Sequence, residues 1–223
     1  MLRTARDRTR YRHRQREPEC DAPLSADMPR GDKWIVCASG PSMLAVDLQH
    51  LRRFSTWRVI VVNNTWSLLP WADVLYACDF RWWETYGEAA SVFAGQKWTT
   101  SGAAAMKHGI KRIGKRDGAG LCIERGHIHT GGNSGYQAVN LAYHFGAKRI
   151  VLLGFDMHRK NGAHWHGEHR DMISAPESHI NAWVRMFEPM ARDMKMAGVD
   201  VVNATPGSAL PWFRMASMGE ALR

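Results

Sequence analysis

The fold of this chain is decided by the stretch WIVCASGPS, residues 34–42. Its first five residues are apolar without alternation, which is typical of a central parallel strand that is covered on both faces. A Gly-Pro pair follows, and a helix is expected from Ser42 because proline suits the first helical turn. Strand, tight turn and helix in this order predict the opening unit of an α/β sheet.

Four further short apolar runs predict strands, and amphipathic stretches separate them. The strands are expected at residues 59–62, 74–78, 150–153 and 199–202. The helices are expected at residues 42–53, 133–145 and 180–197, the last of them kinked or split at Pro189. This alternation predicts a single α/β domain in which helices flank a mostly parallel, Rossmann-like sheet.

Charge is concentrated at the start of the chain. The 223 residues carry a formal net charge of +9, and residues 1–17 hold seven arginines against Asp7 and Glu17, which leaves +4 for the rest. A segment with so few apolar residues cannot offset the entropy cost of ordering. We therefore predict a disordered, Arg-rich tail over residues 1–32 and a nucleotide-binding catalytic domain over residues 33–223. A basic arm that contacts phosphate groups is the functional alternative for the tail.

Neither the apolar runs nor the cysteines indicate export. No apolar run approaches the roughly 18 residues of a membrane span, and the tail lacks the apolar region of a secretory signal. The four cysteines are far apart and form no Cys-x-x-Cys pair: Cys20, Cys37, Cys78 and Cys122. Buried thiols in a reducing cytoplasm are expected. Whether the chain forms an oligomer is left open.

Polar residues follow the predicted strands, where parallel sheets bind their ligands. With one glycine-rich helix start, they form the predicted nucleotide-binding set: Ser39, Gly40, Pro41, Ser42, Asn63, Asp79, Ser134, Gly135 and Asp156. At the Gly-Pro-Ser turn and at the Ser134-Gly135 helix start, free amides and the helix dipole suit a phosphate, and a turn without a ligand is the alternative. The side-chain amide of Asn63 suits a base or a ribose.

Histidine is concentrated in one 22-residue window that contains His158, His164, His166, His169 and His179. A metal site is one interpretation of the His-x-His-x-x-His run at residues 164–169. That run lacks helical i, i+4 spacing and an adjacent cysteine, however. We therefore predict acid–base and phosphate-binding work for these imidazoles, without a metal ion.

The order and spacing of these motifs resemble the bacterial sialyltransferases of glycosyltransferase family 42 and their relatives in phages and bacteria. The resemblance covers roughly residues 33–213. It is carried by Cys37-Ala38-Ser39-Gly40-Pro41-Ser42, Asn63, Ser134-Gly135, Gly154-Phe155-Asp156-Met157-His158 and Thr205-Pro206-Gly207-Ser208. The chain departs from the family at Ala38 and Ser39, and it has His158 and His164 where the family has two phosphate-binding tyrosines.

The resemblance implies a glycosyltransferase A variant of the Rossmann-like fold and a metal-independent, inverting glycosyltransferase. A nucleotide sugar of the CMP type would be the donor, with no further cofactor. The acceptor would be a glycan, or a modified nucleic acid such as a modified base in phage DNA. His158 and His164 would stabilise the departing phosphate. His179 would take the proton of the acceptor hydroxyl, with His169 as the competitor for that role.

Two other classes of function stay open. The Gly-Pro-Ser turn and Asp79 are also similar to the pterin pyrophosphokinase-like domains, in which case Asp79 and Asp156 would hold Mg²⁺ for phosphoryl transfer. A nucleotide- or nucleic-acid-binding protein without activity is the non-enzyme alternative. The sequence Asp79-Phe80-Arg81 breaks an Asp-x-Asp pattern, which speaks against the common metal-dependent sugar transferases.

Overall fold

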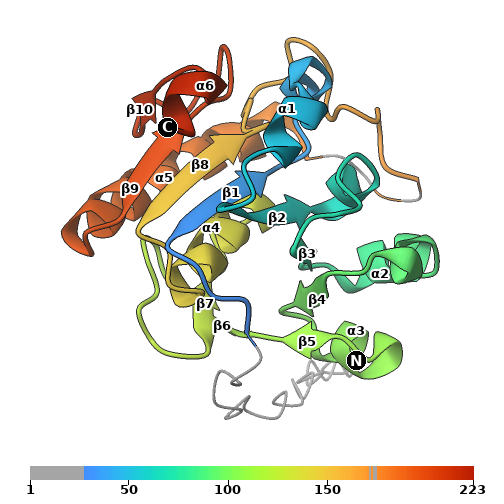
Figure 1. Ribbon diagram of the computed structural model, residues 1–223. Helices are drawn as coiled ribbons and strands as arrows, with labels where there is room; N and C mark the ends of the chain where they lie inside the picture. Colours follow the sequence, from blue (N-terminus) through green and yellow to red (C-terminus); the bar gives the residue numbers. More distant parts are fainter. Residues whose placement is uncertain (1–27, 171, 173–174) are drawn as a thin grey trace, which may run out of the picture.

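The centre of the molecule is an eight-stranded parallel sheet with the strand order β10-β9-β8-β1-β2-β3-β4-β5 (Figure 1). This computed structural model describes residues 28–170, 172 and 175–223. The strands of the sheet are β1 (Lys33–Cys37), β2 (Arg58–Val62), β3 (Val74–Tyr76), β4 (Gln96–Thr99), β5 (Lys111–Arg112), β8 (Arg149–Leu153), β9 (Asp200–Asn203) and β10 (Arg214–Met215). The predicted single α/β domain with a Rossmann-like sheet is confirmed.

The strand order reverses direction next to β1. From β1 the chain builds outward through β2 to β5. It then forms the small parallel pair β6 (Gly114–Arg116) and β7 (His127–His129) and returns to place β8 on the other side of β1. The connections that leave β1 and β8 therefore diverge, which opens a crevice at the carboxyl ends of these two strands.

Helices cover both faces of the sheet, so each central strand is buried on two sides. They are α1 (Leu48–Arg52), α2 (Phe80–Tyr86), α3 (Gly102–His108), α4 (Ser134–His144), α5 (Glu177–Met196) and α6 (Met218–Ala221), with the 3-10 helices η1 (Pro41–Ala45), η2 (Asn63–Ser67) and η3 (Ala89–Val92). In β1, Trp34 and Val36 pack with residues of α4 and α5. Ile35 and Cys37 pack with residues of the other four α-helices. This explains the continuous apolar run of the strand.

The predicted helix at residues 42–53 is wrong, because two short helices occupy this stretch. The 3-10 helix η1 ends at Ala45, and Val46 is extended. Asp47 then begins α1, where its side chain accepts a hydrogen bond from the backbone N–H of His50 at 2.9 Å. An aspartate is a strong N-cap, so it starts a new helix rather than continuing the old one.

The other two predicted helices are confirmed as α4 and α5. Pro189 lies inside α5, and the helix continues past it to Met196. The alternative in which this proline splits the helix in two is therefore wrong.

The predicted tail falls mostly on residues 1–27, which lie outside the described residues. Met28 is buried in the core, and the N–H of Gly31 donates to the carbonyl of Phe145 at 3.3 Å. Residues 28–32 thus pack against the domain. Cys37, Cys78 and Cys122 are free thiols within the described part of the chain. No helix among these residues is both long enough and apolar enough to span a bilayer.

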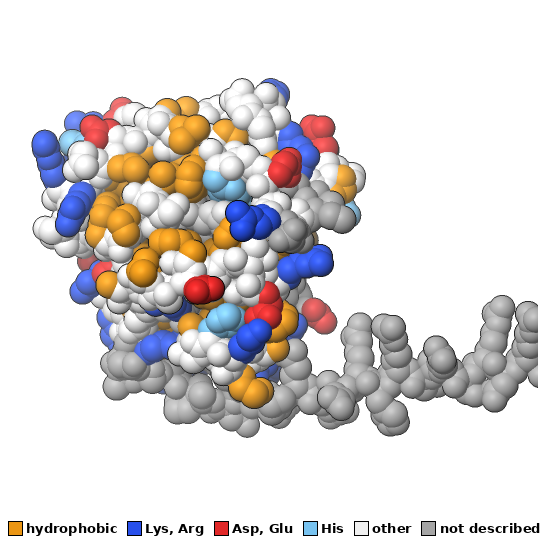
Figure 2. Space-filling model, turned by 90° about the vertical axis from the view of Figure 1, so that its right-hand side faces the viewer, with side chains coloured by type: hydrophobic (Ala, Val, Ile, Leu, Met, Phe, Trp, Pro, Cys, Tyr) orange, Lys and Arg blue, Asp and Glu red, His pale blue; other side chains and the backbone are white. Residues whose placement is uncertain are grey.

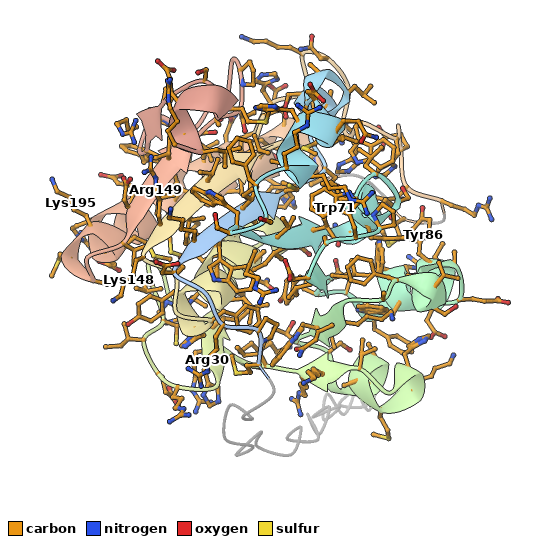
Figure 3. The ribbon with its side chains drawn as sticks, in the orientation of Figure 1. Arg30, Trp71, Tyr86, Lys148, Arg149 and Lys195 are labelled. Atoms are coloured by element: carbon orange, nitrogen blue, oxygen red, sulfur yellow. The ribbon has the colours of Figure 1, made fainter. Side chains whose placement is uncertain are left out.

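Charged side chains of both signs are spread over the face of the domain seen in Figure 2. Figure 3 labels four basic side chains on the side of the sheet where β8 begins: Arg30, Lys148, Arg149 and Lys195. Of these, Arg149 pairs with Asp200 at 3.5 Å. This basic group lies at the amino-terminal side of the strands, opposite the crevice.

Candidate functional site

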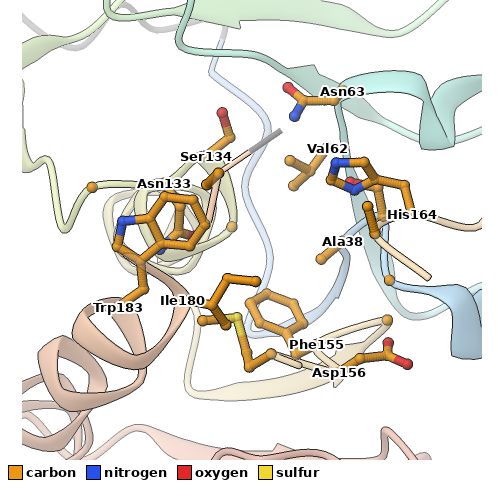
Figure 4. A pocket seen from close by; sticks show the side chains of 18 of the residues that line it. Ala38, Val62, Asn63, Asn133, Ser134, Phe155, Asp156, His164, Ile180 and Trp183 are labelled. Atoms are coloured by element: carbon orange, nitrogen blue, oxygen red, sulfur yellow. The ribbon is translucent and has the colours of Figure 1, made fainter. Parts of the chain in front are cut away.

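A cavity of about 360 Å³ opens at the carboxyl ends of β1, β2, β3 and β8. That volume is in the range of small-molecule sites. Seven residues of the predicted nucleotide-binding set line it: Ser39, Gly40, Asn63, Asp79, Ser134, Gly135 and Asp156. In Figure 4, Ser134 and Trp183 stand on one side of the cavity, and Asn63 and His164 stand on the other. The structure therefore brings together residues that are up to 117 positions apart, from Ser39 to Asp156.

Three of the four predicted catalytic histidines line this cavity, namely His158, His164 and His169. His179 does not line it. It is exposed in the first turn of α5, and its ring centroid lies 6.5 Å from that of Trp183, which does line the cavity. His179 thus lies near the cavity wall on its solvent side.

The Gly40-Pro41-Ser42 turn is held by Asp156. Ser42 donates its backbone N–H to Oδ1 of Asp156 at 3.1 Å and its hydroxyl to Oδ2 at 2.7 Å. Gly40 donates its N–H to the carbonyl of Gly154 at 2.9 Å. The expectation that free amides of this turn receive a phosphate is therefore wrong, because both amides already have acceptors. Pro41 and Ser42 are not among the residues that line the cavity.

Gly40 is required for this contact with Asp156. A Cβ at this position would lie 1.9 Å from Oδ2 of Asp156 and 2.5 Å from the carbonyl oxygen of Gly154. Any side chain would force the carboxylate away or separate the ends of β1 and β8. The glycine thus makes room for a carboxylate of the protein.

The start of α4 presents the free donors that the Gly-Pro-Ser turn lacks. Ser134 and Gly135 are the first two residues of this helix, so their amides have no carbonyl partner within it. The preceding N-cap, Asn133, accepts from the third amide, that of Tyr136, at 2.8 Å. The two residues that carry these N–H groups, at the positive end of an eleven-residue helix, therefore line the cavity.

The hydroxyl of Ser134 is engaged with Cys78. It donates to Sγ of Cys78 at 3.1 Å and accepts from the backbone N–H of Cys78 at 3.3 Å. Burial raises the pKa of this thiol to about 12, with the nearby Asp79 carboxylate adding to the effect. The thiol stays protonated at neutral pH, and the contact fixes the start of α4 against the end of β3.

Arg159 is a lining residue that sequence reasoning missed. Its Nε is buried and makes no hydrogen bond to any described residue. A guanidinium group is always charged and matches the oxygens of a phosphate. In the sequence, only the position of Arg159 next to His158, after a predicted strand, points to a binding role. Because charged residues are common in such loops, this position alone does not single it out.

Trp183 is the second lining residue that was missed. Its indole lies against Gly132, where a Cβ would be 2.4 Å from Nε1. It also borders a second hollow of about 410 Å³ beside the first. An aromatic face between two hollows is suited to stacking on a base or a sugar.

Two tryptophans of α2, Trp82 and Trp83, serve the core. Trp82 and Trp83 are each 1% exposed. Nε1 of Trp82 donates to the side-chain oxygen of Asn64 at 2.8 Å, so Asn64 orients a core residue.

Backbone strain is concentrated at the cavity. Among the described residues, Asn63 (φ 50°) and Met157 (φ 54°) are the non-glycine residues with positive φ, and both line the cavity. Such conformations cost about 1–3 kcal/mol each and cluster at ligand sites. Both strained positions therefore belong to the wall of the cavity.

The carboxylates of this site are poorly placed for Mg²⁺. Both oxygens of Asp156 accept from Ser42, and Asp79 is exposed at the start of α2. Within the described parts of the chain, one group of three potential metal ligands has its ligand atoms within 4.8 Å of one another, and it contains neither of these acids.

Burial changes the chemistry of the cavity histidines. It lowers the pKa of His164 to about 4, and the nearby His166 and Arg159 add to this effect. It lowers the pKa of His169 to about 3, together with repulsion from His164 and His166. Both rings are therefore neutral at pH 7. His164 can therefore offer a phosphate an N–H, but not a positive charge.

Comparison with known proteins supports the fold. No protein-family model and no curated protein sequence matches the chain. Among solved structures, the chain is similar to the MAf glycosyltransferase from Magnetospirillum magneticum AMB-1, with a TM-score of 0.61 and 13% sequence identity. The match covers 90% of this chain and 35% of that protein, so the chain spans about a third of its length. At this identity the likeness establishes a shared fold.

Proposed function

We propose that this chain is a glycosyltransferase whose nucleotide-sugar donor binds in the cavity between β1 and β8. One observation carries the proposal: the same cavity is lined by Ser134 and Gly135, whose amides have no carbonyl partner within α4, and by Arg159, whose Nε has no hydrogen-bond partner among the described residues. Both are phosphate-binding groups, and the cavity lies where parallel sheets hold nucleotides. The shared fold with a glycosyltransferase supports the class of reaction.

In this proposal, residues on different walls of the cavity bind different parts of the donor. The phosphate binds the amides of Ser134 and Gly135 and the guanidinium of Arg159. Asn63 offers its side-chain amide to the base or the ribose, and it makes no hydrogen bond to the described residues that would compete. Trp183 stacks on a ring of the donor or the acceptor. The motif resemblance favours a CMP sugar.

The proposed reaction is a single displacement. The acceptor hydroxyl oxygen forms a bond to the anomeric carbon, and the bond from that carbon to the phosphate oxygen breaks, so the configuration inverts. The electron pair leaves with the nucleotide, where Arg159 and the α4 amides meet the developing charge. The N–H of His158 is already used, because Nδ1 accepts from the N–H of Lys160 at 3.3 Å and Nε2 lies 3.2 Å from the carbonyl of Gly207. The hydroxyl proton passes to a histidine, for which His179 and His169 are the candidates.

The engagement of Asp156 by Ser42 favours this reaction over Mg²⁺-dependent phosphoryl transfer. A magnesium site needs carboxylate oxygens that are free to coordinate. To reach a metal ion, Asp156 would have to give up two hydrogen bonds that hold the Gly-Pro-Ser turn. We therefore propose that nucleotide binding does not require Mg²⁺.

Thermal-shift measurements test the proposal. CMP, CDP, UDP, ATP and cytidine are compared with and without Mg²⁺, because a ligand that binds only the folded state raises Tm. We expect a nucleotide with a pyrimidine base to raise Tm without Mg²⁺, and cytidine to raise it far less. Stabilisation by ATP alone, and only with Mg²⁺, would instead indicate phosphoryl transfer.

A matched pair of variants ties the result to the site. Arg159→Ala removes the proposed phosphate ligand, whereas Lys160→Ala removes an exposed positive charge from the next position. Only the first should weaken nucleotide binding. Transfer or hydrolysis of the sugar nucleotide is then assayed in His179→Ala and His169→Ala. Binding without turnover by the unaltered protein would indicate a non-catalytic nucleotide-binding protein.

A further inference from the structure

Three histidines of the loop between β8 and α5 meet at the edge of the cavity. In His164, His166 and His169, one ring nitrogen from each lies within 4.8 Å of the others. The ring centroids are 4.6–5.1 Å apart, and the rings of His164 and His166 are nearly parallel, at 9°. All three side chains are half-buried. Three titratable groups of one kind are thus packed together.

This packing leaves ring nitrogens without partners. Nε2 of His166 and Nδ1 of His169 are buried and have no hydrogen-bond partner among the described residues. An unpaired buried polar atom destabilises the fold. A neutral imidazole has one ring nitrogen with a lone pair to give. A bound cation would satisfy these lone pairs.

The loop that carries the histidines is fixed from both sides. Trp165 donates its backbone N–H to the carbonyl of Ser39 at 2.9 Å and its indole Nε1–H to Oγ1 of Thr65 at 3.1 Å. At the other end, the N–H of Arg170 donates to the hydroxyl of Tyr86, which Figure 3 labels beside this loop, at 2.8 Å. The histidines therefore lie on a backbone that is held to the ends of β1, η2 and α2. A metal site needs such support.

We propose that His164, His166 and His169 bind a Zn²⁺ ion. Three imidazoles without a thiolate or a carboxylate favour a late first-row metal over Mg²⁺ or Ca²⁺. Tetrahedral Zn²⁺ holds its nitrogens about 3.3 Å apart, so the rings must rotate inward from their present spacing. His164 and His169 line the cavity, and His166 does not. The fourth coordination position therefore faces the cavity, where water or a substrate oxygen completes it.

The zinc site does not depend on the proposed glycosyl transfer, but it bears on that reaction. An occupied site uses the lone pairs of His164 and His169. His169 then has no lone pair with which to accept a proton, which leaves His179 as the general base. Because zinc binding is measured without a nucleotide, failure of the zinc proposal and failure of the nucleotide proposal are distinguishable.

Metal titration of the full chain, made without a polyhistidine tag and stripped with a chelator, tests the site. ZnCl₂ is added, and bound metal and Tm are measured, with MgCl₂ as the comparison and Co²⁺ as the spectroscopic probe. We expect one Zn²⁺ per chain, the visible bands of four-coordinate Co²⁺, and a rise in Tm of about 5–10 °C at a hundredfold excess over Kd.

Variants of His166 assign the ligands, because this residue does not line the cavity. His166→Ala should weaken Zn²⁺ binding more than the roughly 10–100-fold that loss of an outer-shell partner costs. His50→Ala removes an imidazole from α1 and should leave binding unchanged. His166→Cys keeps a zinc ligand and should bind, which guards against a folding defect in the alanine variant. No bound zinc, or equal binding by His166→Ala and the unaltered chain, would overturn the proposal.

Discussion

Gly40→Ala is expected to destabilise the protein by breaking the contact between Asp156 and Ser42. The added methyl would lie 1.9 Å from Oδ2 of Asp156, far inside van der Waals contact. The carboxylate must withdraw, so the two hydrogen bonds from Ser42, at 2.7 and 3.1 Å, are lost or strained. Since Asp156 is only 3% exposed, water cannot easily replace them.

The expected loss follows from these two bonds. A hydrogen bond to a charged group contributes about 1.5–3 kcal/mol, so the pair is worth about 3–6 kcal/mol. This is a large share of the roughly 5–15 kcal/mol that stabilises a typical domain. For a chain of this length, even 3 kcal/mol lowers Tm by about 6–12 °C.

Urea denaturation and thermal melts measure this loss. Gly219→Ala is the matched control, because a Cβ there meets nothing within 4 Å, and it should change stability by less than about 0.5 kcal/mol. Ser42→Ala should be intermediate. The double variant with Gly40→Ala should be less destabilised than the sum of the two, since both break the same contact. A Gly40→Ala variant that is as stable as Gly219→Ala and yet loses nucleotide binding would contradict this prediction. Gly40 would then make room for a ligand rather than for the carboxylate of Asp156.

Three further changes test the remaining structural reasoning. Trp183→Ala should weaken nucleotide-sugar binding by about 5–150-fold, the range measured for lost aromatic stacking, and Trp71→Ala should not weaken it. Isothermal titration measures the affinity of both variants. Equal affinities would exclude stacking by Trp183. Asn140→Leu should lower the free energy of unfolding, measured by urea denaturation, by about 3 kcal/mol or more. The reason is that this fully buried side chain forms hydrogen bonds with the N–H and C=O of Cys122 and with the N–H of His129. A loss below about 1 kcal/mol would contradict this prediction. Burial lowers the pKa of His144 below its usual value near 6.5. As the pH drops below about 6.5, the unfolded chain takes up a proton at His144 before the folded chain does, so the free energy of unfolding falls. His144→Gln should flatten that fall in urea melts between pH 7.5 and 5.5, and an unchanged slope would refute it.

The sheet was predictable because its central strands are buried on both faces. A continuous apolar run such as Val59-Ile60-Val61-Val62 is a strong local signal, and β1, β2, β3 and β8 all carry one. The edge strand β5 is two residues long, and β4 mixes Gln96 and Lys97 with Trp98. Such short or mixed segments become strands because a neighbouring strand pairs with them, and local sequence does not report that pairing.

The position of the cavity in the fold was predictable from the sequence, but the contacts among its residues were not. The rule that parallel sheets bind ligands at strand ends located the cavity from residues such as Ser39 and Asn63. The contact between Ser42 and Asp156 joins residues that are 114 positions apart, so no local pattern reveals that the turn is already occupied. The same holds for Trp183, which reaches the cavity from α5.

Amide chemical shifts of the isotopically labelled protein test whether the start of α4 is the phosphate site. CMP and cytidine differ only in the phosphate, so the difference between the two titrations reports where that phosphate lies. We expect the N–H resonances of Ser134 and Gly135 to shift with CMP and not with cytidine, while those of Gly40 and Ser42 hardly move. Phosphate-dependent shifts at Gly40 and Ser42, with α4 unaffected, would contradict it.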